Sequence, residues 1–150
     1  MKHYLPLISL NSKLHDALHR LVVSELAREG LDGLEPCHGD VLTALFREDG
    51  LTVGCIARRT RRTKSTVSVL VARLHRMGYV EKQGAPGDAR IVRVMLTEKG
   101  RALQGAFERI SERALAALTA GFSEEETAAF ETLLRKACGN FPGAPPAGGS

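Results

Sequence analysis

The sequence predicts a mostly α-helical protein of the α+β class, in which one β-hairpin interrupts a series of helices. Two observations lead to this prediction. Apolar residues recur at spacings of three and four along most of the 150 residues, which is the period of helices that bury one face. Between residues 79 and 96 this period gives way to two runs with valine, isoleucine and tyrosine around a glycine-proline turn, a pattern typical of paired strands.

The first two predicted helices precede residue 50. From about residue 10 to 28, the apolar residues form one helical stripe, made of Leu14, Ala17, Leu18, Leu21, Val22 and Leu26. Gly30 ends this helix, and Pro36 begins the next one, since a proline at the first helical position gives up no hydrogen bond. Asp49-Gly50 ends the second helix.

The next two predicted helices lie close together. Thr52 is a suitable N-cap for a short helix that ends near Thr60. The three residues Arg61–Thr63 connect it to a longer helix over Lys64–Met77, which Gly78 ends. Two helices with such a short connection, the second longer and polar on its outer side, form a helix-turn-helix.

The predicted hairpin follows this pair. Tyr79–Gln83 is predicted as one strand, Gly84–Asp88 as the turn and Arg90–Leu96 as the returning strand. A helix-turn-helix followed by such a hairpin is a winged helix-turn-helix.

Two further helices are predicted after the hairpin. A long one begins after Thr97 and ends near Ala120, with an apolar face made of Leu103, Phe107, Ile110, Leu115 and Leu118. Ser123 opens the last one with a capping box, and its inward residues are predicted to be Phe130, Leu133, Leu134 and Ala137. We expect a single domain over residues 1–138 and a disordered Gly/Pro-rich tail over residues 139–150.

Charge is unevenly distributed along the chain. Residues 51–101 carry a net charge of +9, whereas residues 1–50 carry −3 and residues 102–150 carry −2. A basic middle segment indicates a surface that meets a polyanion, because lysine and arginine release the counterions of a phosphate backbone.

Composition also bears on location and on catalysis. The first ten residues lack a secretory cleavage site, no stretch has membrane-spanning length, and three scattered cysteines make no disulfide framework, so we expect a cytoplasmic protein away from membranes. Phosphate-binding loops and nucleophile motifs are absent, so neither an enzyme nor a cofactor is expected.

The outer face of the Lys64–Met77 helix is the predicted reading surface. Ser65 and Ser68 are small and polar, and Val69 and Ala72 could pack on thymine methyl groups in the major groove of double-stranded DNA. The residues expected to hold phosphates are Arg61, Arg62, Lys64, Arg73 and Arg76. The remaining predicted contacts of this part of the chain are Thr63, Thr66 and Lys82.

The hairpin supplies a second predicted contact. Arg90 is placed to enter a minor groove, and Asp88 could orient it through a charge-assisted hydrogen bond. The alternative from another functional class is a winged-helix protein-interaction module without DNA binding, whose reading helix would be neutral or acidic. RNA binding is less favoured, because Tyr4 and Tyr79 are the only tyrosines and no aromatic stacking platform is evident.

Residues 51–100 resemble the DNA-binding lobe of the MarR family. The most specific pieces are the recognition helix followed by RMGYVEK, the DxR of Asp88 and Arg90, and the LTEKG before the long helix. The chain departs from the family pattern at Val69, where many relatives carry arginine, and at Glu35, where threonine or serine is the usual N-cap.

The resemblance implies a fold, partners and a mode of action. Each chain is expected to form a winged DNA-binding lobe at about 36–96. Helices at about 8–29 and 98–138 are expected to join two chains into a homodimer. The expected function is that of a transcriptional regulator, a repressor on a pseudo-palindromic operator, released by a small-molecule effector that is often aromatic or phenolic.

Four residues are candidates for sensing a signal. Cys37 lies in the first turn of a helix beside His38, where the helix dipole would lower the thiol pKa, so redox sensing is an alternative. His15 and His19 lie four residues apart and could share a metal with His38 or Asp40. That ligand set is incomplete, so solvent or interface histidines are favoured and no metal is expected.

Overall fold

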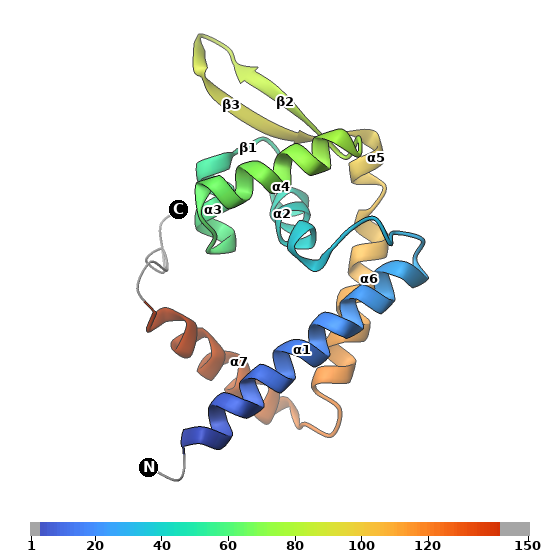
Figure 1. Cartoon of the computed structure of the whole chain (residues 1–150), viewed down its shortest axis with the longest axis vertical. Coiled ribbons are helices and arrows are strands. Elements are labelled where there is room, and N and C mark those ends of the chain that lie inside the picture. Colours follow the sequence, from blue (N-terminus) through green and yellow to red (C-terminus); the bar gives the residue numbers. More distant parts are fainter. Residues whose placement is uncertain (1–3, 142–150) are drawn as a thin grey trace.

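The computed structural model describes residues 4–141, and it confirms a mostly helical fold with a small antiparallel sheet. The elements in chain order are α1 (Tyr4–Arg28), α2 (Pro36–Arg47), β1 (Leu51–Thr52), α3 (Val53–Thr60), α4 (Lys64–Arg76), β2 (Val80–Ala85), β3 (Asp88–Leu96), α5 (Glu98–Arg101), α6 (Gln104–Leu118) and α7 (Glu124–Gly139). The winged lobe occupies one end of the molecule, and α1, α6 and α7 extend to the other (Figure 1). No helix in the described part is long and apolar enough to cross a bilayer.

The winged lobe begins each helix with a side-chain cap. Glu35 and His38 form a reciprocal capping box at the start of α2. The hydroxyl of Thr52 accepts a hydrogen bond from the backbone of Cys55 at 3.2 Å, and Thr63 does the same for Thr66 at 3.2 Å. These caps satisfy backbone N–H groups that have no partner within the helix, which is why the predicted helix starts are confirmed.

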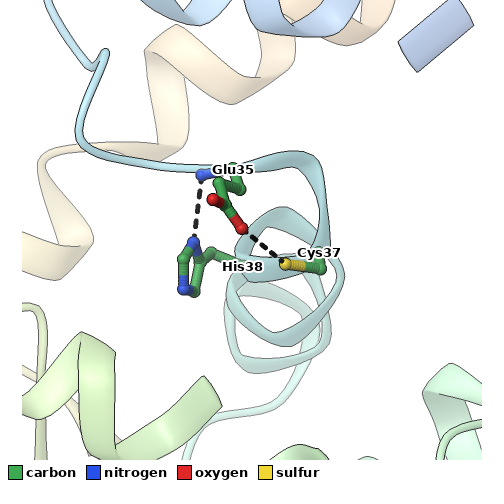
Figure 2. Close-up of side chains that lie close together, drawn as sticks. All are labelled: Glu35, Cys37 and His38. Carbon is green, nitrogen blue, oxygen red and sulfur yellow. Dashed lines mark hydrogen bonds between the residues drawn. The ribbon is translucent and has the colours of Figure 1, made fainter. Parts of the chain in front are cut away.

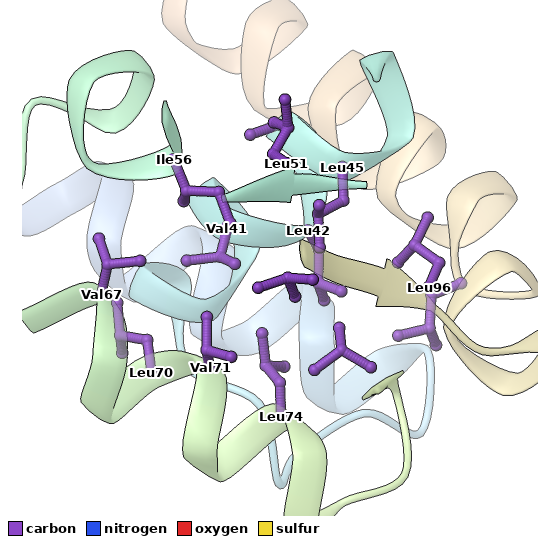
Figure 3. Packing of buried hydrophobic residues seen from close by; sticks show 14 of the residues in the cluster. Val41, Leu42, Leu45, Leu51, Ile56, Val67, Leu70, Val71, Leu74 and Leu96 are labelled. Atoms are coloured by element: carbon purple, nitrogen blue, oxygen red, sulfur yellow. The ribbon is translucent and has the colours of Figure 1, made fainter. Parts of the chain in front are cut away.

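The hydrophobic core joins α2, α3, α4 and the sheet (Figure 3). Its most deeply buried side chains are Leu26, Val41, Leu42, Leu45, Ile56, Val67, Val71, Leu74, Val80 and Val94. Each such burial stabilises the fold by about 1.5–3 kcal/mol relative to an exposed side chain. The apolar stripe of α4 therefore holds that helix against the lobe and leaves its opposite face to the solvent.

The sheet differs from the predicted hairpin in two ways. A short strand that the sequence did not indicate, β1, pairs with β3 and gives the order β1-β3-β2. A two-residue strand is too short to show an alternating pattern. The turn is also shorter than predicted, because β2 continues to Ala85 past a register shift and β3 begins at Asp88, so that only Pro86 and Gly87 connect them.

The predicted long helix after Thr97 is divided in two, so that prediction was wrong. Between α5 and α6 the backbone tightens, and the N–H of Leu103 donates to the carbonyl of Gly100 at 3.1 Å. Gly100 itself packs against the hairpin, since a Cβ there would lie 2.1 Å from the carbonyl oxygen of Tyr79. The short α5 is therefore fixed to the wing, while α6 follows its own direction along α1.

An ion-pair network joins α6 to α1. Arg109 donates to Glu29 at 2.9 Å, and Arg113 donates to Glu29 at 2.8 Å and also to Glu25. These hydrogen bonds lower the pKa of Glu29 from 4.5 to about 2, with the Arg109 contact the largest cause. Sequence patterns did not indicate this network, because its partners lie 80 or more residues apart.

The terminal helices expose apolar side chains that were predicted to be buried. No described residue of α7 is buried, and Leu133 is 62% exposed, so its predicted inward face is wrong for a single chain. The same holds for Leu115 of α6 and Ala17 of α1. The terminal apolar surface consists of Leu7, Ile8, Leu10, Leu115, Phe122, Leu133, Leu134 and Phe141. In Figure 1, α7 lies apart from the winged lobe, at the other end of the molecule.

The termini also differ from the predicted boundaries. Helix α1 begins at Tyr4, several residues before the predicted start, and Pro6 is tolerated in its first turn because the N–H groups there have no helical partner. Gly139 belongs to α7 rather than to the predicted tail. Residues 142–150 of that tail lie outside the described residues.

Candidate nucleic-acid interface

The connection between α3 and α4 directs the second helix outward. Arg61 adopts the left-handed conformation, with a φ of 54°, and its N–H donates to carbonyls of the last turn of α3. A non-glycine residue in this region is uncommon and marks a sharp change of chain direction. After this turn Thr63 caps α4, so the helix begins immediately and presents its polar face to the solvent.

The predicted DNA contacts are accessible in the structure. All thirteen are exposed or half-buried, namely Arg61, Arg62, Thr63, Lys64, Ser65, Thr66, Ser68, Val69, Arg73, Arg76, Lys82, Asp88 and Arg90. Val69 is 55% exposed, so an apolar side chain lies open to the solvent on the outer face of α4. Helix α4 and the wing lie together at one end of the molecule (Figure 1).

Some predicted contacts already have partners within the chain. Arg62 donates to Asp40 of α2 at 2.7 Å, and Arg73 lies 4.0 Å from the carboxylate of Glu35. The hydroxyls of Thr63 and Thr66 hydrogen-bond to each other at 2.9 Å. Arg62 and Arg73 thus connect the reading helix and the turn before it to the start of α2.

The wing places Arg90 as the sequence suggested. The carboxylate of Asp88 accepts a hydrogen bond from the backbone N–H of Arg90 at 2.9 Å and lies 3.4 Å from its Nε. The Arg90 side chain is 93% exposed. A cation that is held at its base and free at its end is suited to a narrow groove with negative potential.

The surroundings of Cys37 disfavour the reactive thiolate of the redox-sensing hypothesis. Its Sγ lies 3.6 Å from a carboxylate oxygen of Glu35, as Figure 2 shows. Burial and this hydrogen bond raise the pKa of the Cys37 thiol, because both disfavour the charged form. The neighbouring His38 supplies no compensating charge, since burial lowers the pKa of its imidazole.

The two histidines of α1 lie on a surface groove. Their ring centroids are 6.3 Å apart, and the groove has a volume of about 460 Å³. It is lined by His15, Leu18, His19, Val22, Glu35, Pro36, Cys37, Asp40 and Arg62. The structure therefore brings His15, His19, Cys37 and Asp40 to one groove, whereas His38 does not line it.

A cluster that shares Glu35 and Cys37 with the lining of this groove has the donor types of a metal site. Ligand atoms of Glu35, Cys37 and His38 lie within 4.8 Å of one another. Two of these atoms are already in use, because His38 Nδ1 accepts from the Glu35 N–H and the Cys37 thiol donates to the Glu35 carboxylate. The geometry of this cluster is explained by helix capping.

Cys55 is a potentially reactive residue that the sequence analysis missed. A guanidinium nitrogen of Arg58 lies 3.1 Å from its sulfur. The Thr52 side chain and the positive charge of Arg58 lower the pKa of the Cys55 thiol, outweighing its partial burial. The available signal was the spacing of three residues from Thr52 to Cys55 and from Cys55 to Arg58, which places all three on one face of the helix.

Known proteins resemble this chain mainly over its winged lobe. Residues 29–91 match the model of a family described as the MarR family. The chain is 37% identical over 68 residues to the HTH-type transcriptional regulator TtmR of Methylorubrum extorquens, which is 45% of this chain and 35% of that protein. It is 28% identical over 117 residues to the exopolysaccharide II synthesis transcriptional activator ExpG of Rhizobium meliloti, 77% of this chain and 60% of that protein.

The fold also has solved counterparts. The S. aureus MepR–DNA complex superposes with a TM-score of 0.79 at 26% identity, covering 89% of this chain and 96% of that one. The matched part of the chain spans 35% of the length of TtmR and 60% of the length of ExpG. Likeness is therefore strongest over the winged lobe and extends in fold to nearly the whole described chain.

Proposed function

Because residues 29–91 match the model of the MarR family, we propose that the chain is a transcriptional regulator of this family that binds double-stranded DNA in the cytoplasm. The observation that carries this proposal is the outer face of α4, where exposed Val69 lies among serine, threonine and arginine side chains. An apolar side chain on such a face suits a thymine methyl group better than it suits water. The basic side chains around it suit phosphates.

Each predicted contact has a role in this proposal. Ser65, Ser68 and Val69 read base edges in the major groove, and Arg90 enters the minor groove beside it. The residues that position the duplex through phosphates are Arg61, Arg62, Lys64, Arg73, Arg76 and Lys82. Thr63, Thr66 and Asp88 hold the contacting side chains in place.

The proposed active form is a homodimer. The terminal apolar surface supports this, because a second copy of the chain would cover side chains that one copy leaves in water. A twofold dimer presents two recognition helices, so its operator is expected to contain half-sites about 10 base pairs apart.

We further propose that a small aromatic or phenolic molecule binds in the groove between α1 and α2. Its binding causes the protein to release the DNA. Arg62 supports this link, because it lines the groove with Asp40 and also belongs to the proposed phosphate contacts. A molecule that displaced the Arg62–Asp40 contact would move the start of α4. Repression is the proposed outcome, and a promoter-reporter assay distinguishes it from activation, which is the activity named for ExpG.

Selection of genomic DNA by the purified protein tests the function. The selected fragments should share a pseudo-palindrome, and their affinity, measured by fluorescence anisotropy, should fall steeply between two salt concentrations. Weak binding without a selected sequence would refute the proposal and would favour a protein-interaction module.

A further inference from the structure

Two cations from different helices converge over the first turn of α3. A β-carbon built on Gly54 would lie 3.8 Å from Nζ of Lys64 and 3.9 Å from Nη1 of Arg58. Lys64 is the first residue of α4, whereas Arg58 follows Gly54 by one turn of α3. Because Gly54 has no side chain, both cations can lie beside the same point on the surface of α3.

No carboxylate compensates these two charges in the described part of the chain. Arg58 and Lys64 are both exposed, and neither has an ion-pair partner among residues 4–141. The guanidinium of Arg58 lies 3.1 Å from the sulfur of Cys55, which is a weak acceptor. Arg58 therefore keeps its charge and most of its hydrogen-bond donors available.

The next residue, Arg59, has a different environment. Its guanidinium donates to the carboxylate of Glu48 at the end of α2. Arg59 also lines a cleft between α2 and α3, which does not include Arg58. Of two adjacent arginines on α3, one is thus paired with an acid of its own lobe, and the other lies beside a second cation.

The start of α3 adds to the positive potential at this point. Thr52 accepts a hydrogen bond from the backbone of Cys55, and the N–H groups of this turn form the positive end of the helix dipole. Positive groups that lie together without an acid repel one another, and an anion between them would offset this repulsion. The arrangement therefore favours an anion that comes from outside the chain.

We propose that Arg58 is a further DNA contact, which binds one backbone phosphate together with Lys64 at the start of α3. This inference rests on the proposed function, and it adds α3 to a surface that otherwise consists of α4, the turn before it and the wing. Phosphate contacts position a protein on the duplex and carry no sequence information. Arg58 thus fixes how α4 is placed in the major groove and leaves the choice of bases to α4.

The two adjacent arginines provide a matched test. Arg58→Gln and Arg59→Gln change the net charge equally, and fluorescence anisotropy measures the Kd of each for the selected operator and for a duplex of shuffled sequence. Arg58→Gln should raise both Kd values by the same factor, because a phosphate contact is independent of sequence. Arg59→Gln should bind as the wild type does, and equal melting temperatures show that both variants are folded.

Salt dependence gives the expected magnitude. Two lost phosphate contacts in a dimer lower the slope of log K against log salt by about 1.8. Between 50 and 200 mM salt, the rise in Kd should therefore be about 12-fold smaller for Arg58→Gln than for the wild type. An unchanged slope, or an equal loss in Arg59→Gln, would overturn the contact.

Methylphosphonate substitution shows whether the two cations share one phosphate. Each substitution removes the charge of a single phosphate of the operator. In each half-site, one substitution should weaken binding of the wild type and have no effect on Arg58→Gln or on Lys64→Gln. If the two variants became insensitive at different phosphates, the shared site would be wrong.

Substitution of Gly54 tests the site without removing a charge. A β-carbon there would lie 3.4 Å from Cε of Lys64, which is an ordinary contact, so Gly54→Ala should keep the wild-type Kd. The longer side chain of Gly54→Leu would occupy the space beside the two cations and should raise the Kd. Both residues favour a helix more than glycine does, so neither variant should lose stability. Equal Kd values for the two variants would count against the site.

Binding by the wild type separates this inference from the proposed function. If the wild type binds the operator and Arg58→Gln behaves as Arg59→Gln does, the phosphate contact of Arg58 is refuted and the proposed function stands. If the wild type binds no duplex at either salt concentration, the proposed function is refuted, and this inference fails with it.

Discussion

Replacing Arg90 by alanine tests the wing most directly. The side chain is 93% exposed and, among the described residues, bonds to Asp88 alone, so its removal should not change the stability of the fold. A lost groove contact typically costs about 1–3 kcal/mol, and a dimer loses two of them, or about 2–6 kcal/mol. Since 1.4 kcal/mol is a factor of ten, the operator Kd should rise at least about 30-fold.

Salt dependence provides a second magnitude for the same variant. Each lost contact with the DNA charge lowers the slope of log K against log salt by about 0.9, so the dimer should lose about 1.8. Fluorescence anisotropy over a range of potassium chloride concentrations measures both quantities. The matched control is Arg28→Ala, another exposed arginine in a local ion pair, at the end of α1.

The control should bind the operator as the wild type does. If Arg90→Ala also retained the wild-type Kd and slope, the wing would have no part in binding. If Arg28→Ala weakened binding to the same degree, the loss would reflect net charge rather than a specific contact.

Three further predictions follow from the structure. Leu133→Asp should convert a dimer to a monomer in light scattering after size exclusion, and a dimer unchanged by this charge would exclude α7 from the interface. The stability that Glu29 contributes is present above pH 4.5 and is lost as the pH falls through about 2. In urea melts, Glu29→Gln should therefore have a lower free energy of unfolding than the wild type at pH 7, and this free energy should fall less as the pH is lowered. Matching curves for variant and wild type would contradict this. Cys55 should react with iodoacetamide faster than Cys37 at pH 8, because the pKa of Cys55 is lowered and that of Cys37 is raised, and mass spectrometry of digested peptides would expose the reverse order.

Local rules accounted for most of the winged lobe. Thr52 acts as an N-cap where the sequence suggested, and Asp88 orients Arg90 through a contact between residues two apart. Such contacts involve neighbours in the chain, so their geometry follows from residue type and spacing. The α4 stripe belongs to the same class, because its period alone separates the packed face from the reading face.

Errors arose where a residue's environment depends on distant parts of the chain. The long predicted helix divides because Gly100 packs against Tyr79 of the wing, and a helical period carries no information about that contact. Leu133 is exposed because no other part of the described chain covers α7. An apolar stripe predicts that a face will be covered, but it does not identify the covering surface.

By itself, the sequence determined the helix-turn-helix, the hairpin that follows it and the concentration of basic residues in this part of the chain, because caps, periods and local charge depend on nearby residues. Only the tertiary structure decided the chemistry of the sensing candidates. It raised the pKa of Cys37, lowered that of Cys55, and buried Nε2 of His38 without a hydrogen-bond partner among the described residues. Burial and long-range partners set a side chain's proton affinity and hydrogen bonding, and these arise only when separate segments pack together.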